Sequence, residues 1–231
     1  SEFVRTAEDQ RRVFLQADYV QPIGKSGQFE IGYRGDFNKL DTDYDVEFIQ
    51  HTIDELGITN PSNVLDFKET INAVYTQYGD KMGRFSYLAG LRLEYTRLRG
   101  KVDSEFDLSN LEDLLGEDVD VNFDKDYLGL FPTVNLIYEI TEDQNITLGY
   151  NRRINRPRGW FINPFPSRSS RTNIFQGNPD LDPAFSNTFD LGYLKRWRLL
   201  TLTSSIYYQR ETGSFQRIQE PTGITTPDGI E

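Results

Sequence analysis

The stretch that decides the predicted fold is Phe85-Ser86-Tyr87-Leu88-Ala89-Gly90-Leu91-Arg92-Leu93-Glu94-Tyr95. One set of alternate positions is apolar and comprises Phe85, Tyr87, Ala89, Leu91, Leu93 and Tyr95. The opposite set includes Ser86, Gly90, Arg92 and Glu94. Because successive side chains of a strand point to opposite sides, this period of two predicts a β-strand with one apolar side and one side that tolerates water.

The same alternation recurs along the chain. It is clear at 128–138 and 145–151, and further candidates lie at 13–20, 28–38, 64–78, 185–195 and 199–210. The sequence therefore predicts about eight strands of roughly ten residues or more, which is the length that a tilted strand needs to cross a bilayer. No stretch approaches the roughly 18 consecutive apolar residues of a membrane-spanning helix, so a helical membrane protein is excluded.

Short and long connections alternate between these strands. The short ones lie near 22–27, 79–83, 141–144 and 196–198, and the long ones at about 40–63, 99–126 and 157–184. Long loops are uncommon in compact soluble domains. An outer-membrane barrel has this asymmetry, with tight periplasmic turns and long extracellular loops. The predicted fold is therefore all-β, an up-and-down antiparallel transmembrane β-barrel.

One region departs from the regular pattern. Phe29, Ile31, Tyr33 and Phe37 occupy odd positions, whereas Tyr44, Val46 and Phe48 occupy even positions. Either a β-bulge or a change of environment near 39–42 would explain the switch.

Composition and charge exclude several classes of function. A net charge of -11 argues against a nucleic-acid partner, since phosphate backbones are bound by clustered Lys and Arg. A single His and the absence of Cys argue against a His-based metal centre and a Ser-His-Asp triad. Asp41, Asp43, Asp45 and Glu47 resemble a calcium-binding run, but the sixth and twelfth positions of that motif hold Val46 and Thr52. We expect a solvated acidic strand edge there, with no metal and no cofactor.

Residues 145–193 carry a specific order of short motifs. A strand ending in an Arg-Arg-Ile-Asn-Arg-Pro run is followed by an Asn-Pro-Phe loop, a Gly-Asn-Pro-x-Leu-x-Pro element and a second strand. The residues of these motifs are Arg152, Arg153, Asn155, Arg156, Pro157, Asn163, Pro164, Phe165, Gly177, Asn178, Pro179, Leu181 and Pro183. This order resembles the TonB-dependent receptors, a family of outer-membrane β-barrels.

The resemblance implies a location and a function. Members take up a scarce nutrient, such as a siderophore, a glycan or a peptide, across the outer membrane of Gram-negative bacteria. They have about 22 strands around an amino-terminal plug. Residues 1–231 are thus expected to be part of a single barrel domain, about eight strands of a larger one, without the plug. The implied partners are outer-membrane lipid and lipopolysaccharide, the plug, TonB acting through a missing N-terminal region, a possible surface lipoprotein, and an unknown small or oligomeric substrate.

The 157–184 link contains candidate substrate contacts. Its prolines cannot donate to a sheet ladder, so the link must leave the sheet and take a defined shape. Arginines there offer planar donors for carboxylate or phosphate groups, and the candidates are Arg153, Arg156, Arg158, Arg168 and Arg171. Alternatively, these arginines pair with Asp180, Asp182, Asp190 or lipopolysaccharide phosphates. Charges facing the lumen, such as Arg34, Arg92, Glu94 and Asp190, would contact a plug or form structural ladders.

The predicted function is that of a non-enzymatic receptor and transporter. Two other readings stay open at this point. One is a barrel for adhesion, secretion or envelope assembly, which would have the same strands. The other is a soluble secreted β-rich domain that binds carbohydrate, which would stay in solution without detergent.

Overall fold

The computed structural model describes residues 2–48, 62–104, 122–165, 167–168 and 174–219. Its main feature is one antiparallel sheet of eight strands in the order β1-β2-β3-β4-β5-β6-β9-β10. The strands are β1 Glu2–Ile23, β2 Gly27–Phe48, β3 Asn63–Met82, β4 Phe85–Asp103, β5 Asn122–Thr141, β6 Gln144–Asn155, β9 Ala184–Arg196 and β10 Thr201–Thr212. The prediction of an all-β, up-and-down fold with about eight strands is confirmed, and the described sheet is not closed.

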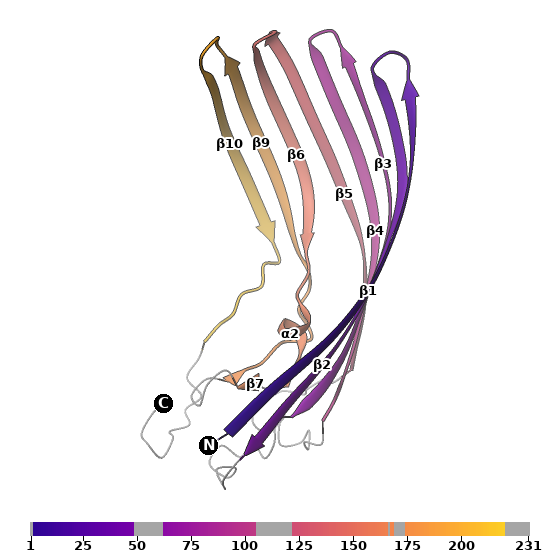
Figure 1. Ribbon diagram of the computed structural model, residues 1–231, viewed down its shortest axis with the longest axis vertical. Coiled ribbons are helices and arrows are strands. Elements are labelled where there is room, and N and C mark those ends of the chain that lie inside the picture. The colour runs from indigo at the N-terminus through magenta and orange to yellow at the C-terminus, as the bar shows by residue number, and fades with distance from the viewer. Residues whose placement is uncertain (1, 49–61, 105–121, 166, 169–173, 220–231) are drawn as a thin grey trace.

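Figure 1 shows a curved sheet with its tight turns gathered at one end, and the start of β1 and the end of β2 at the other. Gly24 and Gly83 have φ angles of 66° and 63° in two of these turns, a left-handed conformation that favours glycine. Between β6 and β9 the chain leaves the sheet and forms the helix α2 Gly159–Ile162 and the paired short strands β7 Ser167–Arg168 and β8 Ile174–Phe175. No helix in the described ranges has the length and apolar character to span a membrane.

Several strands are longer than predicted, which corrects the bounds of the long links. β2 continues to Phe48 and β3 starts at Asn63, so the expected link at 40–63 begins as a strand. Likewise β4 continues to Asp103 and β5 starts at Asn122, within the expected link at 99–126. On one side these strand ends carry charges, such as Asp41 and Lys101, and on the other side they carry buried apolar residues, such as Val46 and Val102. The hydrophobic period that marks the other strand segments is therefore reversed or lost there.

The side of the sheet that bears the regular apolar alternation is here called the outer face. Leu91, Leu130, Leu148 and Phe189 are examples, and all are exposed on their strands. A continuous exposed apolar band of this kind would aggregate in water, whereas it matches the lipid-facing side of an outer-membrane barrel. On this criterion the membrane-spanning segments extend from the turns to Val13, Phe37, Thr70, Tyr95 and Leu128 on β1 to β5.

The switch in apolar parity on β2 comes from a change of environment and not from a bulge. The pairing of β2 with β1 and with β3 runs without a register shift through this region. Beyond Phe37 the outer face carries Lys39 and Asp41, while Tyr44 and Val46 are buried on the opposite side. The polarity of the two sides of the sheet is thus inverted between the membrane-spanning part and the strand ends.

A small dry core lies on this inner side at the loop end of the sheet. It contains buried residues of three strands, namely Leu65, Phe67, Leu98, Val102 and Phe123. Ile162 and Phe165 from the segment after β6 are buried in the same cluster. The core therefore joins the strand ends to the segment that leaves the sheet.

The two sides of the sheet predict different responses to a new charge. Leu91→Arg places a cation on the apolar outer face, and we expect a loss of about 2–4 kcal/mol of stability near the middle of a bilayer. Asn135→Arg, an exposed position on the inner side of β5, should leave stability nearly unchanged. The measurement is the yield of heat-modifiable, folded protein in the outer-membrane fraction of expressing cells. Equal yields for the two variants would contradict the assignment of the outer face.

Candidate functional site

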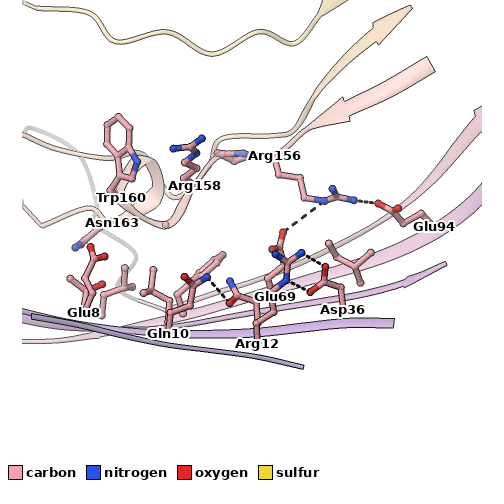
Figure 2. A pocket seen from close by; sticks show the side chains of 18 of the residues that line it. Glu8, Gln10, Arg12, Asp36, Glu69, Glu94, Arg156, Arg158, Trp160 and Asn163 are labelled. Atoms are coloured by element: carbon pink, nitrogen blue, oxygen red, sulfur yellow. Dashed lines mark hydrogen bonds and ion pairs between the residues drawn. The ribbon is translucent and has the colours of Figure 1, made fainter. Parts of the chain in front are cut away.

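A cavity of about 930 Å³ lies between the inner side of β1–β4 and the segment 156–163. Figure 2 shows the strand residues along one side and the segment with Arg156, Arg158 and Trp160 along the other. The polar and charged lining includes Glu8, Gln10, Arg12, Arg34, Asp36, Asn38, Glu69, Arg92, Glu94, Arg156, Arg158 and Asn163. This volume is within the range of cavities that hold small ligands.

Arg156 ties the segment after β6 to the strand wall. Its Nη2 forms an ion pair with the Glu94 carboxylate and also donates to Thr96 Oγ1 at 3.1 Å. Its Nε lies 3.8 Å from Glu69 Oε1. The side chains of Arg156 and Glu94 are only 19% and 6% exposed, so the pair is largely removed from water. Losing one member of such a pair leaves the other as an uncompensated buried charge.

Two further arginine–carboxylate contacts extend along the wall. Arg92 donates from Nε and Nη2 to Glu94 Oε2, at 2.9 and 2.6 Å. Arg12 forms a two-pronged contact with Asp36, with Nε to Oδ1 at 2.7 Å. Such forked pairs fix geometry as well as charge. The inner wall is therefore a ladder of alternating charges across β1–β4.

The groups near Arg156 that lie beyond the membrane-spanning segments are perturbed by burial. Burial raises the pKa of the Glu69 carboxyl above its usual value, although Arg156 opposes the shift. Burial likewise lowers the pKa of the Arg156 guanidinium. Burial, with a contribution from Glu69, raises the pKa of the Tyr127 phenol. The charged groups of the site are thus poorly solvated, and the ionised form of each is stabilised mainly by its charged neighbours.

Backbone contacts explain the glycine and asparagines of the motifs. The Gly177 N–H donates to the Asn163 carbonyl at 2.8 Å, and the Asn178 N–H donates to the Phe161 carbonyl at 2.7 Å. A Cβ on Gly177 would lie 2.5 Å from the Asn163 oxygen, so only glycine permits this approach. Asn163 Nδ2 in turn donates to Asn63 Oδ1 of β3 at 3.2 Å. The Asn-Pro-Phe and Gly-Asn-Pro motifs therefore hold the two halves of the segment together and against the sheet.

Apolar residues of the same motifs anchor the segment. Ile162 and Phe165 are 2% and 3% exposed within the dry core, and Leu181 packs against it. Pro164 is fully buried. Burial of side chains of this size contributes about 1.5–3 kcal/mol each. The motif residues thus have a structural role that their sequence order alone did not reveal.

Among the residues that it describes, the structure places two of the five candidate arginines at the cavity. Arg156 and Arg158 line the cavity, whereas Arg153 is exposed at the end of β6 and is not part of the lining. Arg168 lies in β7, and Arg171 lies outside the described residues. The carboxylates that Arg156 contacts are Glu69 and Glu94, and not Asp180, Asp182 or Asp190 of the alternative pairing.

Asp180 and Arg152 contact residues that do not line the cavity. Asp180 lies 3.7 Å from Lys125 Nζ, measured from Oδ1. The Arg152 guanidinium lies 4.9 Å from the centroid of the Phe185 ring. Neither residue therefore joins the charge ladder of the cavity.

Sequence reasoning missed Arg12, Asp36 and Glu69 as site residues. Asp36 alternates with the apolar residues of the predicted strand at 28–38. This alternation indicates that Asp36 points to the polar side of the sheet, and it could have identified Asp36 as a site residue. Arg12 falls one residue before the predicted strand at 13–20. Nothing in the sequence indicates that Glu69 and Glu94 converge on one arginine from a distant segment.

Aromatic rings gather where the segment meets the cavity. Trp160 and Phe161 stack with ring centroids 3.8 Å apart, and Phe175 lies 5.0 Å from Trp160. Phe215 packs edge-on against Phe161 at 5.2 Å. Trp160 remains 49% exposed and lines the cavity. An exposed, supported indole of this kind is a common ligand anchor.

In the part of the chain that the structure describes, no group of three or more His, Cys, Asp or Glu residues could hold a metal ion.

The first prediction for this site concerns Arg156. Arg156→Ala removes one of the two arginine partners of Glu94, the other being Arg92, and we expect a loss of about 1.5–3 kcal/mol of stability, as for a hydrogen bond to a charged group. Arg153→Ala, an exposed arginine of the same motif, serves as the matched control and should have little effect. Thermal unfolding of the intact protein in detergent, with hydrogen exchange of residues 156–165, provides the measurement. Unchanged protection of these residues in Arg156→Ala would show that the ion pair does not hold the segment.

The second prediction concerns pH. Because the Glu69 pKa is raised in the folded state, its favourable contribution is complete below the unfolded value of about 4.3 and is lost as pH rises through the folded value. Glu69→Gln removes this titration. We therefore expect the stability of wild type relative to Glu69→Gln to fall as pH is raised from about 4, measured by paired thermal unfolding curves. A difference that stays constant with pH would refute the shift.

Comparison with solved structures gives the same fold at low sequence identity. The ferric yersiniabactin uptake receptor FyuA from Yersinia pestis has a TM-score of 0.65 and 13% identity, over 90% of this chain and 30% of that one. The ferric citrate transporter FecA has a TM-score of 0.63 and 12% identity, over 96% and 30%. The copper transporter OprC has a TM-score of 0.64 and 12% identity, over 89% and 32%. The chain thus spans about a third of the structures it matches.

No sequence match was found among curated proteins. A family model described as the outer membrane protein beta-barrel family matches residues 2–227, which is nearly the whole chain. The up-and-down sheet and its apolar outer face agree with that match. The chain therefore belongs to the outer membrane protein β-barrel family and is located in the outer membrane.

Proposed function

We propose that this chain forms part of the barrel wall of a TonB-dependent receptor that takes up a scarce nutrient and is not an enzyme. The observation that carries the proposal is the segment 156–165, which is fixed over the inner side of the wall by Arg156 and by Ile162 and Phe165. A fixed segment above a charged, cavity-bearing wall is suited to capturing a solute at the mouth of a barrel. The structural neighbours described above as an uptake receptor and as transporters support this choice.

The proposed orientation places the long links outside the cell and the tight turns in the periplasm. This follows the general asymmetry of outer-membrane barrels. The cavity then lies toward the external end, since its segment 156–163 is on the opposite end of the sheet from the turns (Figure 1). In this proposal residues 1–231 are one stretch of a single barrel domain. The plug, TonB acting through an N-terminal region, and a surface lipoprotein are its proposed partners.

Within the cavity, Arg158 and Trp160 are the proposed substrate contacts. Arg158 is exposed and has no ion-pair partner among the described residues, unlike Arg156. Its guanidinium can therefore pair with a carboxylate or phosphate of a ligand without first breaking a protein contact. Arg153, Arg168 and Arg171 remain proposed contacts of the same kind. Arg156 is better placed to position the segment than to bind substrate.

An uptake assay tests the proposal. The intact protein is expressed in a host that lacks its own receptors, and cells are given ferric citrate, maltohexaose or tetra-alanine as radiolabelled probes of three nutrient classes. We expect energy-dependent accumulation of at least one probe. Accumulation of ferric citrate or tetra-alanine, which carry carboxylates, should fall about tenfold in Arg158→Gln, because a charge-assisted hydrogen bond contributes about 1.5–3 kcal/mol.

Arg198→Gln is the matched control, since Arg198 is an exposed arginine in the turn at the opposite end of the sheet. It should leave accumulation unchanged. Failure of all three probes to accumulate, or accumulation that does not depend on cellular energy, would favour a barrel for adhesion, secretion or envelope assembly instead.

A further inference from the structure

Glu8 lines the cavity as an exposed carboxylate without a partner. Among the residues that the structure describes, it takes part in no ion pair and no hydrogen bond. Its row across the inner side of β1–β3 continues with Thr42 and Leu65, which carry no charge. The nearest cation on the inner side of β1 is Arg12, about 13 Å along the strand, and Asp36 holds its guanidinium. The wall around Glu8 therefore leaves its negative charge uncompensated.

The segment after β6 brings Arg158 and Trp160 over the same part of the wall. Gly159 lies between them in the chain and packs on the strands, since the position of a Cβ there is 3.8 Å from Leu65 Cδ2. Leu65 belongs to the row of Glu8, two strands away or about 10 Å. Figure 2 shows Glu8 on the strand side of the cavity, with Arg158 and Trp160 on the side of the segment. An unpaired anion and an unpaired cation thus border one space, next to an exposed indole.

The indole of Trp160 adds a preference for a cation on the side of Glu8. Phe161 covers one face of the indole at a centroid distance of 3.8 Å, and Trp160 is still 49% exposed. An aromatic face attracts a cation within about 6 Å of its centroid, and the indole does so most strongly. An ammonium group can therefore be bound by the carboxylate and the ring together.

These three groups favour one class of ligand over two others. A neutral sugar would stack on Trp160 without neutralising either charge. A polyanion would pair with Arg158 but would be repelled by Glu8, which the wall leaves uncompensated. A ligand that carries both an ammonium group and a carboxylate is complementary to all three side chains.

We propose that the cavity binds a short peptide with a free amino terminus. Its ammonium group lies between Glu8 and Trp160, and its carboxylate pairs with Arg158. The separation of about 10 Å between Glu8 and the wall beneath Gly159 matches about three extended residues, at about 3.3–3.6 Å each. The two charged groups of a single amino acid are too close together for this span. The inference rests on the proposed function, because it names the substrate class of that site and adds Glu8 to its contacts.

Isothermal titration calorimetry of the intact protein in mild detergent tests the inference. The probes are tetra-alanine, N-acetyl-tetra-alanine and tetra-alanine amide, which differ only at their ends. We expect wild type to bind tetra-alanine about tenfold more tightly than either blocked peptide, because each block removes one charge-assisted contact. Glu8→Gln should weaken tetra-alanine binding about tenfold and abolish the preference over the acetylated peptide. Arg158→Gln should abolish the preference over the amide.

Asp9→Asn is the matched control, because Asp9 is the next acid of β1 and is exposed on the outer face. It should leave the binding of all three peptides unchanged, and heat-modifiability of every variant confirms folding. The inference is overturned if tetra-alanine does not bind, if Glu8→Gln binds it as wild type does, or if acetylation of the amino terminus has no effect.

Failure of this inference and failure of the proposed function give different results. Accumulation of ferric citrate or maltohexaose, with no binding of tetra-alanine, would overturn the inference and leave the proposed function intact. Binding of tetra-alanine that depends on Glu8, without energy-dependent accumulation of any probe, would support the peptide site and contradict uptake.

Discussion

The alternation of side chains along each strand is the constraint on which the rest of the structure depends. In the membrane-spanning part it directs apolar residues such as Leu91 outward and charged residues such as Arg92 inward. Beyond Phe37 the side chains alternate in the same way, but the charged residues Lys39 and Asp41 point outward and the apolar residues Tyr44 and Val46 point inward. Since no register shift intervenes, a change of surroundings from lipid to water accounts for the inversion. One continuous sheet therefore serves as a membrane wall at one end and as one side of a small aqueous domain at the other.

This inversion also explains what the sequence could predict. The strand at 85–95 and its relatives were predictable because a lipid-facing side demands an uninterrupted apolar period. The strand ends at 40–48 and 99–103 fall in the long links that the sequence predicts, because charges such as Asp41 and Lys101 occupy alternating positions there. Pairing with neighbouring strands stabilises these ends, and such long-range pairing leaves no mark on local hydrophobicity.

The cavity was predictable only in part for a related reason. The arginine-rich, proline-rich link pointed to Arg156 and Arg158, since these residue types suit a shaped loop with planar donors. The carboxylates that meet Arg156 come from β3 and β4, far away along the chain, and only the register of the sheet brings Glu69 and Glu94 together. The motif around Asn163 and Gly177 is likewise explained by tertiary contacts, because the backbone oxygens of Asn163 and Phe161 lie 2.5 and 2.6 Å from the position that a Cβ of Gly177 would take.

The ion pair between Arg156 and Glu94 limits how far the segment 156–165 can move from the strand wall. Lifting the segment from the wall would expose its apolar anchors Ile162 and Phe165, at a cost of about 1.5–3 kcal/mol each, and would take one of two arginine partners from Glu94. At equilibrium, fewer than about one molecule in a hundred would then have this segment raised. The segment is consequently a fixed part of the inner wall and not a swinging gate.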